Sequence, residues 1–560
     1  MTDGDMYRRI RKEISEHDLT LTLNADGAPI FKSSNYSMWP VQVVVNELPR
    51  HMRQNNVLVP LLWYGQSRPD MTLLLGSVVK QMDELGLDGV SWTVGTQMIH
   101  SKVYCVSCTA DSSARAIMQN MAQYNGYYGC GWCLHQGVPI DRTIKYPVGG
   151  AVEERTSQQT LKMMAEAAAS SKAVQGVKGP SALINLQHFD IVWSFTPDYM
   201  HCVLLGVTRQ LTELWLASVG EPFYIGSPDD LYELDERLLS IKPPLCFPRL
   251  PRSLLQRKYW KATGGSSGCF FSLPCVVGVL PAKYSRHYSL LVRGIALMLK
   301  DTVSDDDITE STKCIVRFVV GVQFLYDEAE MTFNMHQLLH LPKSAALQGP
   351  LWAHSFFMFE SNIGQVKKLV TSAHGVSQQI VERLMMTANL ENLKALASTQ
   401  TQELLSKSPT TTKQAVVPLG TARPVSAALL AWVHEEMGDI IAGPVVEHDR
   451  VAVSGFVFHS EQYKRPYKTD STVLLMSGTF VKAETLLSAT DHFGNKKVFA
   501  VSQKYVTKAI MKTSHILKCE SLGGKKLVEV LPTALPSMFV NFGNEMFVTV
   551  LMQKVLFASS

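Results

Sequence analysis

Three acidic residues that lie far apart in the sequence are of the type that binds divalent cations. Asp26 precedes Gly27 at the end of an alternating run, Asp111 follows a second apolar run, and Glu360 begins a helical stretch. Hard cations such as Mg²⁺ or Mn²⁺ prefer oxygen ligands. Two such ions, roughly 4 Å apart, activate the attacking oxygen in phosphodiester cleavage and stabilise the leaving one. The three carboxylates therefore predict a two-metal site. The alternative is a turn residue, a helix N-cap and a solvated helix residue.

A second group of side chains has the spacing of a zinc site. Cys130 and Cys133 form a C-x-x-C pair, which is half of a tetrahedral site. His336 and His340 are four residues apart, so they share one face of a helix and could complete a Cys₂His₂ set. In the alternative interpretation the two cysteines are small buried hydrophobic residues and the histidines belong to an ordinary helix face.

Two further pairs have recognisable spacing. Asp198 and His201 begin a helix, and Asp198 is expected to cap its first turn. Cys105 and Cys108 repeat the C-x-x-C spacing. On a strand these two positions point to opposite faces of the sheet, which argues against their sharing one ion.

The elements that would position the acids alternate between strand and helix in the first 125 residues. Periodicity and turn residues predict a helix over 3–16, strands over 19–25, 38–48 and 56–65, a helix after Asp70, a strand over 102–110 and a helix over 111–124. Three strands, a helix, a fourth strand and a helix form the opening order of the RNase H-like fold. That fold places an Asp on its first strand beside an Asp at the end of its fourth, and Asp26 and Asp111 occupy these positions.

The predicted secondary structure of the remaining chain is first mainly helical and then mainly β. Helices are expected over 165–174, 198–218, 284–300, 313–329, 331–345 and 356–398, and the Ser/Thr/Lys-rich stretch 406–414 is the expected linker. Short β-type runs follow it. The predicted class is α/β, with an RNase H-like core that begins with residues 1–140 and ends with the helices of 331–400, which include Glu360. A mainly helical insertion (141–330) interrupts the core, and a small all-β C-terminal domain (415–560) follows it.

Composition limits the class of protein. Hydrophobic residues make up 46% of the chain and charged residues 18%, as in folded globular proteins. A net charge of +4 permits nucleic-acid binding without arguing for it. No apolar run reaches the length of a membrane span and no signal peptide is recognisable, so no membrane association is expected. The ten cysteines are then expected to be reduced thiols or metal ligands in an intracellular protein.

Several segments together resemble the transposases of CACTA-type (En/Spm-like) DNA transposons, particularly their metazoan relatives. With gaps, the resemblance runs from about residue 20 to 385, through NADGAPIFKSSNYSMWPVQVVVNELP, ADSSARAIMQNMAQYNGYYGCGWCLHQG, FDIVWSFTPDYMHCVLLGVTRQL, NMHQLLHLP and GPLWAHSFFMFESNIGQVKKLV. It implies an RNase H-like DDE core with a helical insertion before the final Glu. Asp26, Asp111 and Glu360 would hold the catalytic Mg²⁺ or Mn²⁺ ions, and Asp198 and His201 would belong to a motif near the active site or DNA.

The resemblance also implies a function and partners. The expected activity is metal-dependent DNA cleavage and strand transfer. The expected partners are transposon ends and target DNA, the expected location is the nucleus, and a homodimer is the expected assembly. A structural Zn²⁺ would tie Cys130 and Cys133 to the helix of His336 and His340.

Two features favour an inactive relative. The run Gly264–Gly268 stands where relatives continue with an acidic residue and bulky apolar ones, and helix is unfavourable through it. If the third carboxylate belonged to that segment, catalysis would be lost. The chain also begins almost at the nuclease core, which leads us to expect a relic, a fragment or a domesticated copy without an upstream DNA-binding domain.

Three functions therefore remain open. The leading one is a DDE nuclease and strand transferase. The second is a catalytically inactive, transposase-derived scaffold that binds nucleic acid or protein. The third and weakest is a hydrolase that pairs Cys130 or Cys133 with His201, since no oxyanion-hole or nucleophile-elbow signature accompanies that pair.

Overall fold

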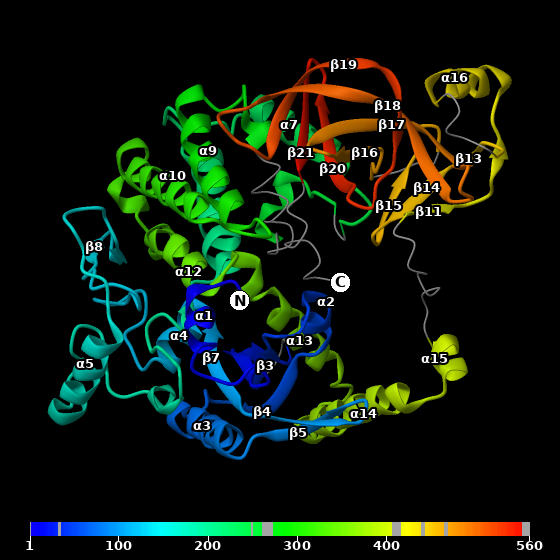
Figure 1. The fold of residues 1–560 in the computed structure, drawn as a ribbon. Helices are drawn as coiled ribbons and strands as arrows, with labels where there is room; N and C mark the ends of the chain where they lie inside the picture. The colour runs from blue at the N-terminus through cyan, green and yellow to red at the C-terminus, as the bar shows by residue number, and fades with distance from the viewer. Residues whose placement is uncertain are drawn as a thin grey trace. The chain divides into compact units, whose positions relative to one another are not determined.

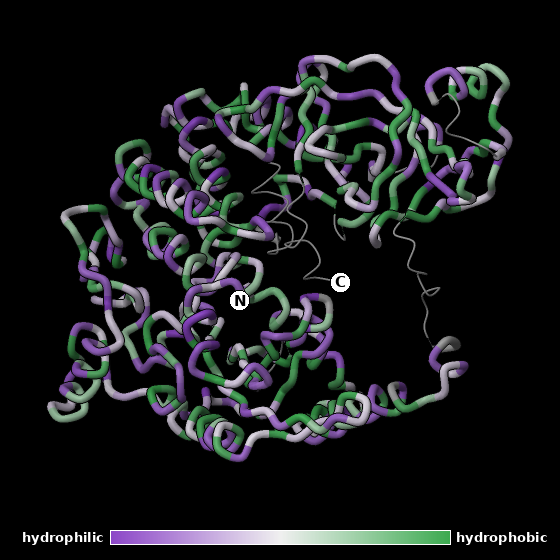
Figure 2. Tube along the Cα trace, in the orientation of Figure 1, coloured by the Kyte–Doolittle hydropathy of each residue, from purple (hydrophilic) through white to green (hydrophobic). Residues whose placement is uncertain are grey.

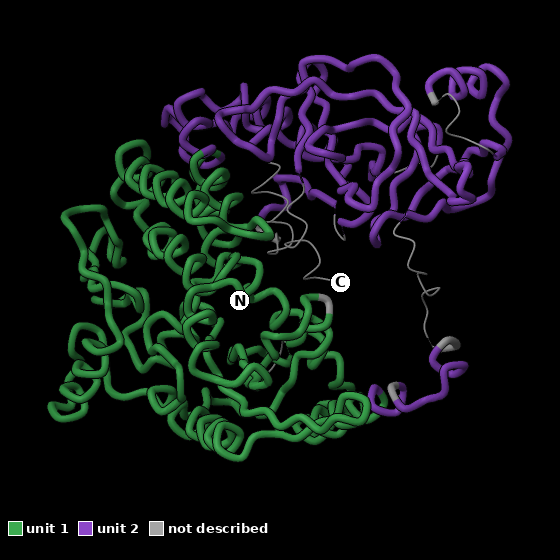
Figure 3. Tube along the Cα trace, in the orientation of Figure 1, with its two compact units in different colours: residues 1–215, 290–390, 559 green, residues 216–289, 391–558, 560 purple. Residues whose placement is uncertain are grey.

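The structure, a computed structural model, describes most of the chain and divides it into two compact units (Figure 3). The described residues are 2–31, 35–247, 250–259, 273–405, 416–437, 443–463 and 469–550. Unit 1 comprises residues 1–215 and 290–390, and unit 2 comprises residues 216–289 and 391–558. The expected helical insertion is thus divided between the units. The glycine run 264–268 and the expected linker 406–414 lie outside the described residues.

Unit 1 is built on a mixed sheet centred on β1 (Figure 1). Its strand order is β4–β3–β1–β7–β10, and the short β2 pairs with the start of β3. β1 runs antiparallel to β3 and parallel to β7, while β3 is antiparallel to β4 and β10 parallel to β7. The strand bounds are β1 Leu19–Ala25, β2 Ala28–Pro29, β3 Ser37–Val45, β4 Leu58–Gly65, β7 Val103–Thr109 and β10 Phe195–Thr196. The four strands predicted before residue 111 are all confirmed.

The alternating pattern of β1 has a different cause from the one expected. Alternation of apolar and polar residues is typical of a strand with one face in water, whereas Thr20, Thr22 and Asn24 are all buried along with the apolar positions between them. Because β1 is central, its polar side chains are satisfied by neighbouring strands. The Thr22 hydroxyl lies 2.7 Å from Asn46 Oδ1 and 2.8 Å from the Ser107 hydroxyl. Buried polar groups need such partners.

The helices predicted over 3–16 and 111–124 are shorter in the structure, the helix predicted after Asp70 is confirmed, and the short helix α2 was not predicted. α1 spans Asp5–Ile10, α2 Arg50–Asn55, α3 Met71–Leu87 and α4 Ser112–Met118. Asp70 caps α3 as a helix start should, accepting hydrogen bonds from the backbone N–H groups of Thr72 and Leu73. α4 ends early because Asn120 takes a left-handed conformation with φ of 54°.

A hairpin that the sequence analysis did not predict lies between α3 and β7. β5 (Val90–Val94) pairs with β6 (Gln97–Ser101) through a turn at Gly95, whose φ is 60°. The signal was present as an apolar–polar alternation with Gly at the turn. Trp92 and Met98 are 41% and 73% exposed, so the hairpin is not part of the core.

The helices that belong wholly or partly to unit 1 include several of the predicted segments with changed bounds. The elements are α5 Ser157–Ser170, η1 Ala182–Asn185, η2 Met200–Val207, α6 Thr208–Ala217, α9 Ala282–Met298, α10 Asp305–Leu325, η4 Glu328–Glu330, α11 Phe333–Gln337, η5 Leu338–His340, α12 Leu341–Gln348, η6 Leu351–His354, α13 Phe357–Lys368 and α14 Val376–Leu396. The stretch predicted as one helix over 198–218 starts as the π-helical segment η2. The stretch over 356–398 is broken before Gly375, whose φ is 60°. Across the described ranges, no helix combines the length and apolar character needed to cross a bilayer.

Unit 2 contains a closed six-stranded antiparallel barrel. The strands follow the order β16–β20–β21–β19–β18–β17, and β17 closes the ring by pairing with β16. Their bounds are β16 Val473–Met476, β17 Thr479–Thr490, β18 Lys496–Ala509, β19 Ile516–Glu529, β20 Leu535–Phe542 and β21 Glu545–Val550. Hydrophobic stretches recur along these strands (Figure 2). The β-rich C-terminal region is confirmed, but it is not all-β, because the helix Ala427–Met437 lies within it.

Smaller elements complete unit 2. A second sheet joins β11, β14 and β15, while β12 and β13 extend the barrel sheet beyond β17. The remaining bounds are α7 Pro228–Ser240, η3 Leu254–Tyr259, α15 Thr399–Leu405, β11 Val416–Leu419, β12 Arg423–Pro424, α16 Ala427–Met437, β13 Val446–His448, β14 Arg450–Val453 and β15 Phe456–His459.

Candidate functional site

Two of the three predicted acids lie at one edge of the sheet of unit 1. Asp26 follows the last residue of β1, and Asp111 lies two residues after the end of β7. β1 and β7 are parallel neighbours, so their carboxyl ends meet at the same edge. Asp26 Oδ1 accepts a hydrogen bond from the Gly27 backbone N–H at 2.7 Å, and Asp111 Oδ1 accepts one from the Ala114 N–H at 2.6 Å, which caps α4. Both acids thus have the local turn and cap roles, which leave their second oxygens for other ligands.

The glycine after Asp26 is required by close packing. A Cβ at Gly27 would collide with the indole ring of Trp39 on β3. Trp39 is 6% exposed and belongs to the core of unit 1. The Asp-Gly pair and the later Trp therefore form one packing unit that fixes where the chain leaves β1.

Glu360 lies in the first turn of α13 and is exposed. α13 is fastened to the rest of unit 1 at its start. Asp198 Oδ1 accepts a hydrogen bond from the backbone N–H of Phe356, the residue before the helix, at 3.0 Å. Thr109, two residues before Asp111, donates from its hydroxyl to the His354 carbonyl at 3.0 Å. These bonds bring the start of α13 to the end of β7.

An amide relay fastens α13 to the sheet at a second point. Asn362 Nδ2 donates to Gln42 Oε1 at 2.8 Å, Gln42 Nε2 donates to Asn24 Oδ1 at 2.9 Å, and Asn24 Nδ2 donates to the Thr109 carbonyl at 2.7 Å. Asn24, Thr109 and Asn362 each lie two residues from one of the three acids. The sequence analysis missed these polar residues because buried amides on strands give no pattern of their own.

The charges of Asp111 and Glu360 act on Asp26. Burial and then the negative charge of Asp111 raise the pKa of Asp26 to about 7, with Glu360 adding to the effect and the Gly27 N–H and His201 opposing it. Like charges close together disfavour each other's ionised form. The structure therefore brings Asp26, Asp111 and Glu360 into one electrostatic neighbourhood, where a divalent cation would relieve the repulsion.

The predicted pair Asp198 and His201 adjoins this neighbourhood. His201 Nδ1 lies 2.8 Å from Asp198 Oδ2, which also accepts the His201 backbone N–H at 3.0 Å. Burial alone would lower the pKa of His201, but the hydrogen bond and charge of Asp198, helped by Asp111 and Asp26, raise it to about 9. The imidazole is then cationic at neutral pH. Asp198 is more than a helix cap, because it also holds His201 and α13.

A further cation and a cavity adjoin the acids, and neither was predicted. Burial lowers the pKa of Lys367, two turns after Glu360 on α13, while Asp26 and Glu360 favour its charged form. A cavity of about 500 Å³ is lined by Asp111, His201, Tyr124, Lys145 and Phe333, among others. Of the three acids, Asp111 therefore borders a space with cationic and aromatic walls.

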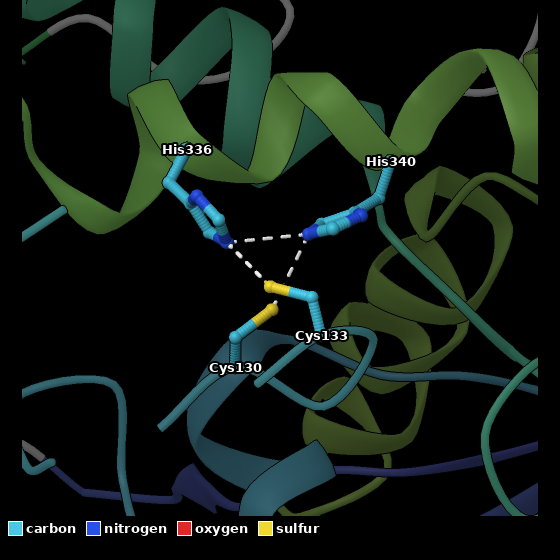
Figure 4. Close-up of side chains that lie close together, drawn as sticks. All are labelled: Cys130, Cys133, His336 and His340. Atoms are coloured by element: carbon cyan, nitrogen blue, oxygen red, sulfur yellow. Dashed lines mark hydrogen bonds between the residues drawn. The ribbon is translucent and has the colours of Figure 1, made fainter. Parts of the chain in front are cut away.

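The four residues of the predicted zinc set converge in unit 1 (Figure 4). Cys130 Sγ lies 3.3 Å from His340 Nε2, Cys133 Sγ lies 3.2 Å from His336 Nε2, and the two Nε2 atoms are 3.2 Å apart. All four ligand atoms lie within 4.8 Å of one another and all four residues are buried. Zn–S bonds of about 2.3 Å and Zn–N bonds of about 2.0 Å in a tetrahedron would place the ligand atoms at similar separations. The group could hold a metal ion such as zinc.

The two thiols of this cluster titrate in opposite directions: the hydrogen bond to Cys130 and burial raise the pKa of Cys133, while the pKa of Cys130 is lowered. Burial would raise the pKa of Cys130, but the hydrogen bond from Cys133 and the imidazoles of His340 and His336 leave it well below its usual range. Burial lowers the pKa of His336 and keeps its ring neutral. Thiolate sulfur and neutral imidazole are the forms that ligate metals.

Two buried arginines shape the C-x-x-C loop. Arg155 Nε donates to the carbonyls of Cys130 and Cys133 at 3.0 and 3.1 Å. Arg115 lies with Cζ 4.6 Å from the centre of the Trp132 ring and against Gly131, so a Cβ at Gly131 would strike its guanidinium. The sequence Cys-Gly-Trp-Cys is thus fitted around Arg115.

The remaining Cys and His pairs considered from the sequence form neither a metal site nor a catalytic dyad. Among the described residues, the Cys₂His₂ set is the one group of three or more Cys, His, Asp or Glu side chains gathered for one ion. Cys105 and Cys108 are buried on β7 outside it, and the three acids are neighbours without being gathered as closely. The Cys–His dyad with His201 is not formed either, because His201 pairs with Asp198 and the thiols of Cys130 and Cys133 face the other histidines.

The fold and the site define an α/β protein with a cluster of carboxylates at the end of a mixed sheet and a neighbouring Cys₂His₂ group. Residues 6–147 match the model of the transposase family tnp2. The matched segment includes Asp26, Asp111, Cys130 and Cys133, whereas Glu360, His336 and His340 lie beyond it. No curated protein matches the chain. The match supports descent from a transposase.

Proposed function

We propose that this chain is a transposase-derived, metal-dependent DNA nuclease and strand transferase that works through Asp26, Asp111 and Glu360. The observation that carries the proposal is the meeting of three acids, from β1, the end of β7 and α13, in one electrostatic neighbourhood. The sheet order β4–β3–β1–β7–β10, antiparallel among the first three strands and parallel beyond β1, is the order expected of an RNase H-like core and supports it. The match to a transposase family over residues 6–147 points the same way.

The residues present fit a pair of divalent cations. Carboxylate oxygens are hard donors, and burial together with the repulsion from Asp111 raises the pKa of Asp26, a condition that a cation relieves. Bound Mg²⁺ or Mn²⁺ would supply activation of the attacking oxygen and stabilisation of the leaving one. Asp26 and Asp111 would hold the cations from the sheet and Glu360 from the helix.

The chain's own cations have separate roles in this proposal. The imidazolium of His201, fixed by Asp198, would contact a phosphate oxygen of the bound strand. Lys367 would do the same from α13. The reaction would be hydrolysis at an element end followed by attack of the freed 3′-hydroxyl on target DNA. Such work would place the protein in the nucleus, acting on transposon ends and target DNA, with a homodimer as the proposed assembly.

The experiment that tests the proposal compares Asp111→Asn with wild type. Labelled duplex and supercoiled plasmid are incubated with protein and Mn²⁺, and nicking and joined products are measured. Asn caps a helix as well as Asp does, so α4 should form. We expect a loss of roughly 10³-fold or more, the scale seen when charge stabilisation is removed from a transition state. Asp141→Asn, at an exposed turn of the same unit, is the matched control. Equal cleavage by both variants would refute the assignment.

A second candidate is a transposase-derived binding protein without cleavage. It is favoured by the exposure of Glu360 and by the family match, which ends before that residue. In this case the Cys₂His₂ group would remain as a structural zinc site that holds the C-x-x-C loop to α11 and η5. Wild-type protein that binds duplex DNA and yields no cleavage with Mg²⁺ or Mn²⁺ would select this candidate.

A further inference from the structure

Positive charge is concentrated on one hairpin of the barrel. Between residues 496 and 529, which hold β18, β19 and their connection, there are eight lysines and two glutamates, a net charge of +6. The entire chain has a net charge of +4, so the other residues together are slightly acidic. This segment is the basic hairpin.

The register of the hairpin places like charges together. Lys508 on β18 lies directly opposite Lys518 on β19, and both are exposed. Like charges at directly opposite positions destabilise a strand pair. Lysines often protect a free sheet edge, but Lys518 belongs to a segment paired on both sides, with β18 and with β21. Edge protection therefore does not explain it.

Few of these lysines are neutralised within the protein. Lys497, Lys518 and Lys525 pair with Glu529, Glu545 and Glu484 at 3.4, 2.6 and 2.6 Å. The other five are exposed and have no acidic partner anywhere in the described ranges of the chain: Lys496, Lys504, Lys508, Lys512 and Lys526. A segment that keeps five exposed lysines without an acidic partner is suited to an external polyanion.

We propose that the basic hairpin binds the phosphate backbone of duplex DNA without reading its sequence. A strand rises about 3.3 Å per residue, so Lys504 and Lys508 are spaced by about 13 Å. B-DNA carries one negative charge per about 1.7 Å of its axis, so a line of lysines meets many phosphates. The aromatic residues of these strands, Phe499 and Tyr505, are buried at 5% and 3% exposure. Single-strand binding relies on exposed stacking rings, so duplex is the form that fits.

This surface would give the proposed nuclease a DNA-binding site separate from its carboxylates. The choice of DNA as the partner rests on the proposed function. The surface lies wholly within unit 2, and the three acids lie within unit 1. Changes to the hairpin should thus alter DNA affinity and leave the chemistry of bound substrate unchanged.

The test measures duplex binding in the full-length chain carrying Asp111→Asn, so that no substrate is consumed. Fluorescence anisotropy gives the association constant over a series of KCl concentrations. With Lys504→Gln and Lys508→Gln together, two exposed lysines without an acidic partner, we expect weaker binding and a slope of log K against log salt reduced by about 1.8, since each phosphate contact contributes about 0.9. The matched control is Lys162→Gln with Lys172→Gln, two exposed lysines of unit 1 that remove the same charge. A thermal scan checks that both variants fold.

The outcomes separate this inference from the proposed function. The inference is overturned if the slope of log K against log salt is unchanged in the hairpin variant, or if the control variant loses as much of that slope. This holds even if wild type cleaves DNA. A loss of slope confined to the hairpin variant supports it even if wild type does not cleave. Hairpin-dependent binding to phosphatidylserine vesicles with an unchanged DNA slope would assign the surface to a membrane and overturn the DNA proposal.

Discussion

Gln42 on β3 accepts a hydrogen bond from Asn362 on α13 at 2.8 Å, and this bond joins the sheet to the helix that carries Glu360. Gln42 is fully buried, and its side-chain amide also donates a hydrogen bond to Asn24 on β1 at 2.9 Å. A buried amide with all partners satisfied fixes one geometry, because any shift leaves a polar group unpaired. The separation of Glu360 from Asp26 is thus set by residues that touch no substrate.

Gln42→Leu should misplace α13 as well as weaken the fold. Loss of a buried partner costs about 1–3 kcal/mol, because Asn24 and Asn362 are left unsatisfied. We expect this loss in urea unfolding, together with weaker Mn²⁺ binding measured by calorimetry. Asn362→Leu should give the same weakening, and the double variant should show less than the sum of both effects.

The control for this prediction is Thr22→Val. Thr22 is buried on β1 and hydrogen-bonded to Asn46 and Ser107, away from α13. The Thr22→Val variant should lose about as much free energy of unfolding as Gln42→Leu and keep the Mn²⁺ affinity of wild type. If Thr22→Val and Gln42→Leu weaken Mn²⁺ binding equally, the relay has only a structural role.

Asp198→Asn should remove the charge on His201 near neutral pH. The pKa of His201 is raised to about 9, chiefly by Asp198 against the effect of burial. A folded pKa above the unfolded value of about 6.5 contributes stability that is full below pH 6.5 and is lost as pH rises through 9. We expect wild type to lose stability over that window and Asp198→Asn to lose less. Histidine NMR titration measures the pKa directly, and an unshifted His201 resonance would contradict the assignment.

How far the sequence could predict this site depends on the kind of signal. Alternation and turn residues located β1 and β7, and their parallel pairing placed Asp26 and Asp111 at one edge. The C-x-x-C and four-residue histidine spacings located the Cys₂His₂ group, because ligand spacing is set by one ion's geometry. Both signals come from residues that are close together along the chain, so one sequence is enough to show them.

The remaining features depend on contacts between distant segments. Asn24, Gln42 and Asn362 are unremarkable polar residues until β1, β3 and α13 are packed together. The alternation of β1 is typical of a strand with one face in water, whereas Thr22 bonds to Asn46, just after β3, and to Ser107 on β7. Lys367 acquires its neighbours only when α13 approaches β1. The periodicity of apolar residues indicates which positions are buried, but it does not indicate which polar groups hydrogen-bond to one another.

Metal-free protein should become less stable as pH rises from about 4 to 7. The pKa of Asp26 is raised to about 7, mainly by burial and Asp111, against about 3.9 in the unfolded chain. The folded state therefore holds a proton that the unfolded state has lost over this window, so stability falls with rising pH. Thermal unfolding of protein freed of Mg²⁺ should show this slope, and Asp26→Asn should abolish it.

Adding Mn²⁺ tests in a second way whether Asp26 is a metal ligand. The cation must displace the proton of Asp26, so it should raise the melting temperature more at pH 8 than at pH 5.5. Asp141→Asn, at an exposed turn, should behave as wild type. A Mn²⁺ effect of equal size at both pH values would argue that Asp26 is not a ligand.

Zinc content should depend on Cys133 and not on Cys105. Both are buried cysteines of unit 1, but only Cys133 has histidine nitrogen beside its sulfur, at 3.2 Å from His336 Nε2. We expect one zinc per chain in wild type by plasma mass spectrometry, less than about a tenth of that in Cys133→Ser, and a full complement in Cys105→Ser. The site joins the C-x-x-C loop to α11, so removing the ion with a zinc-selective chelator should also lower stability. The expected loss is about 4 kcal/mol if free zinc is a thousandfold above the dissociation constant. Full zinc occupancy in Cys133→Ser would show that the cluster does not bind the ion, and the thiols would then be ordinary buried residues of the core.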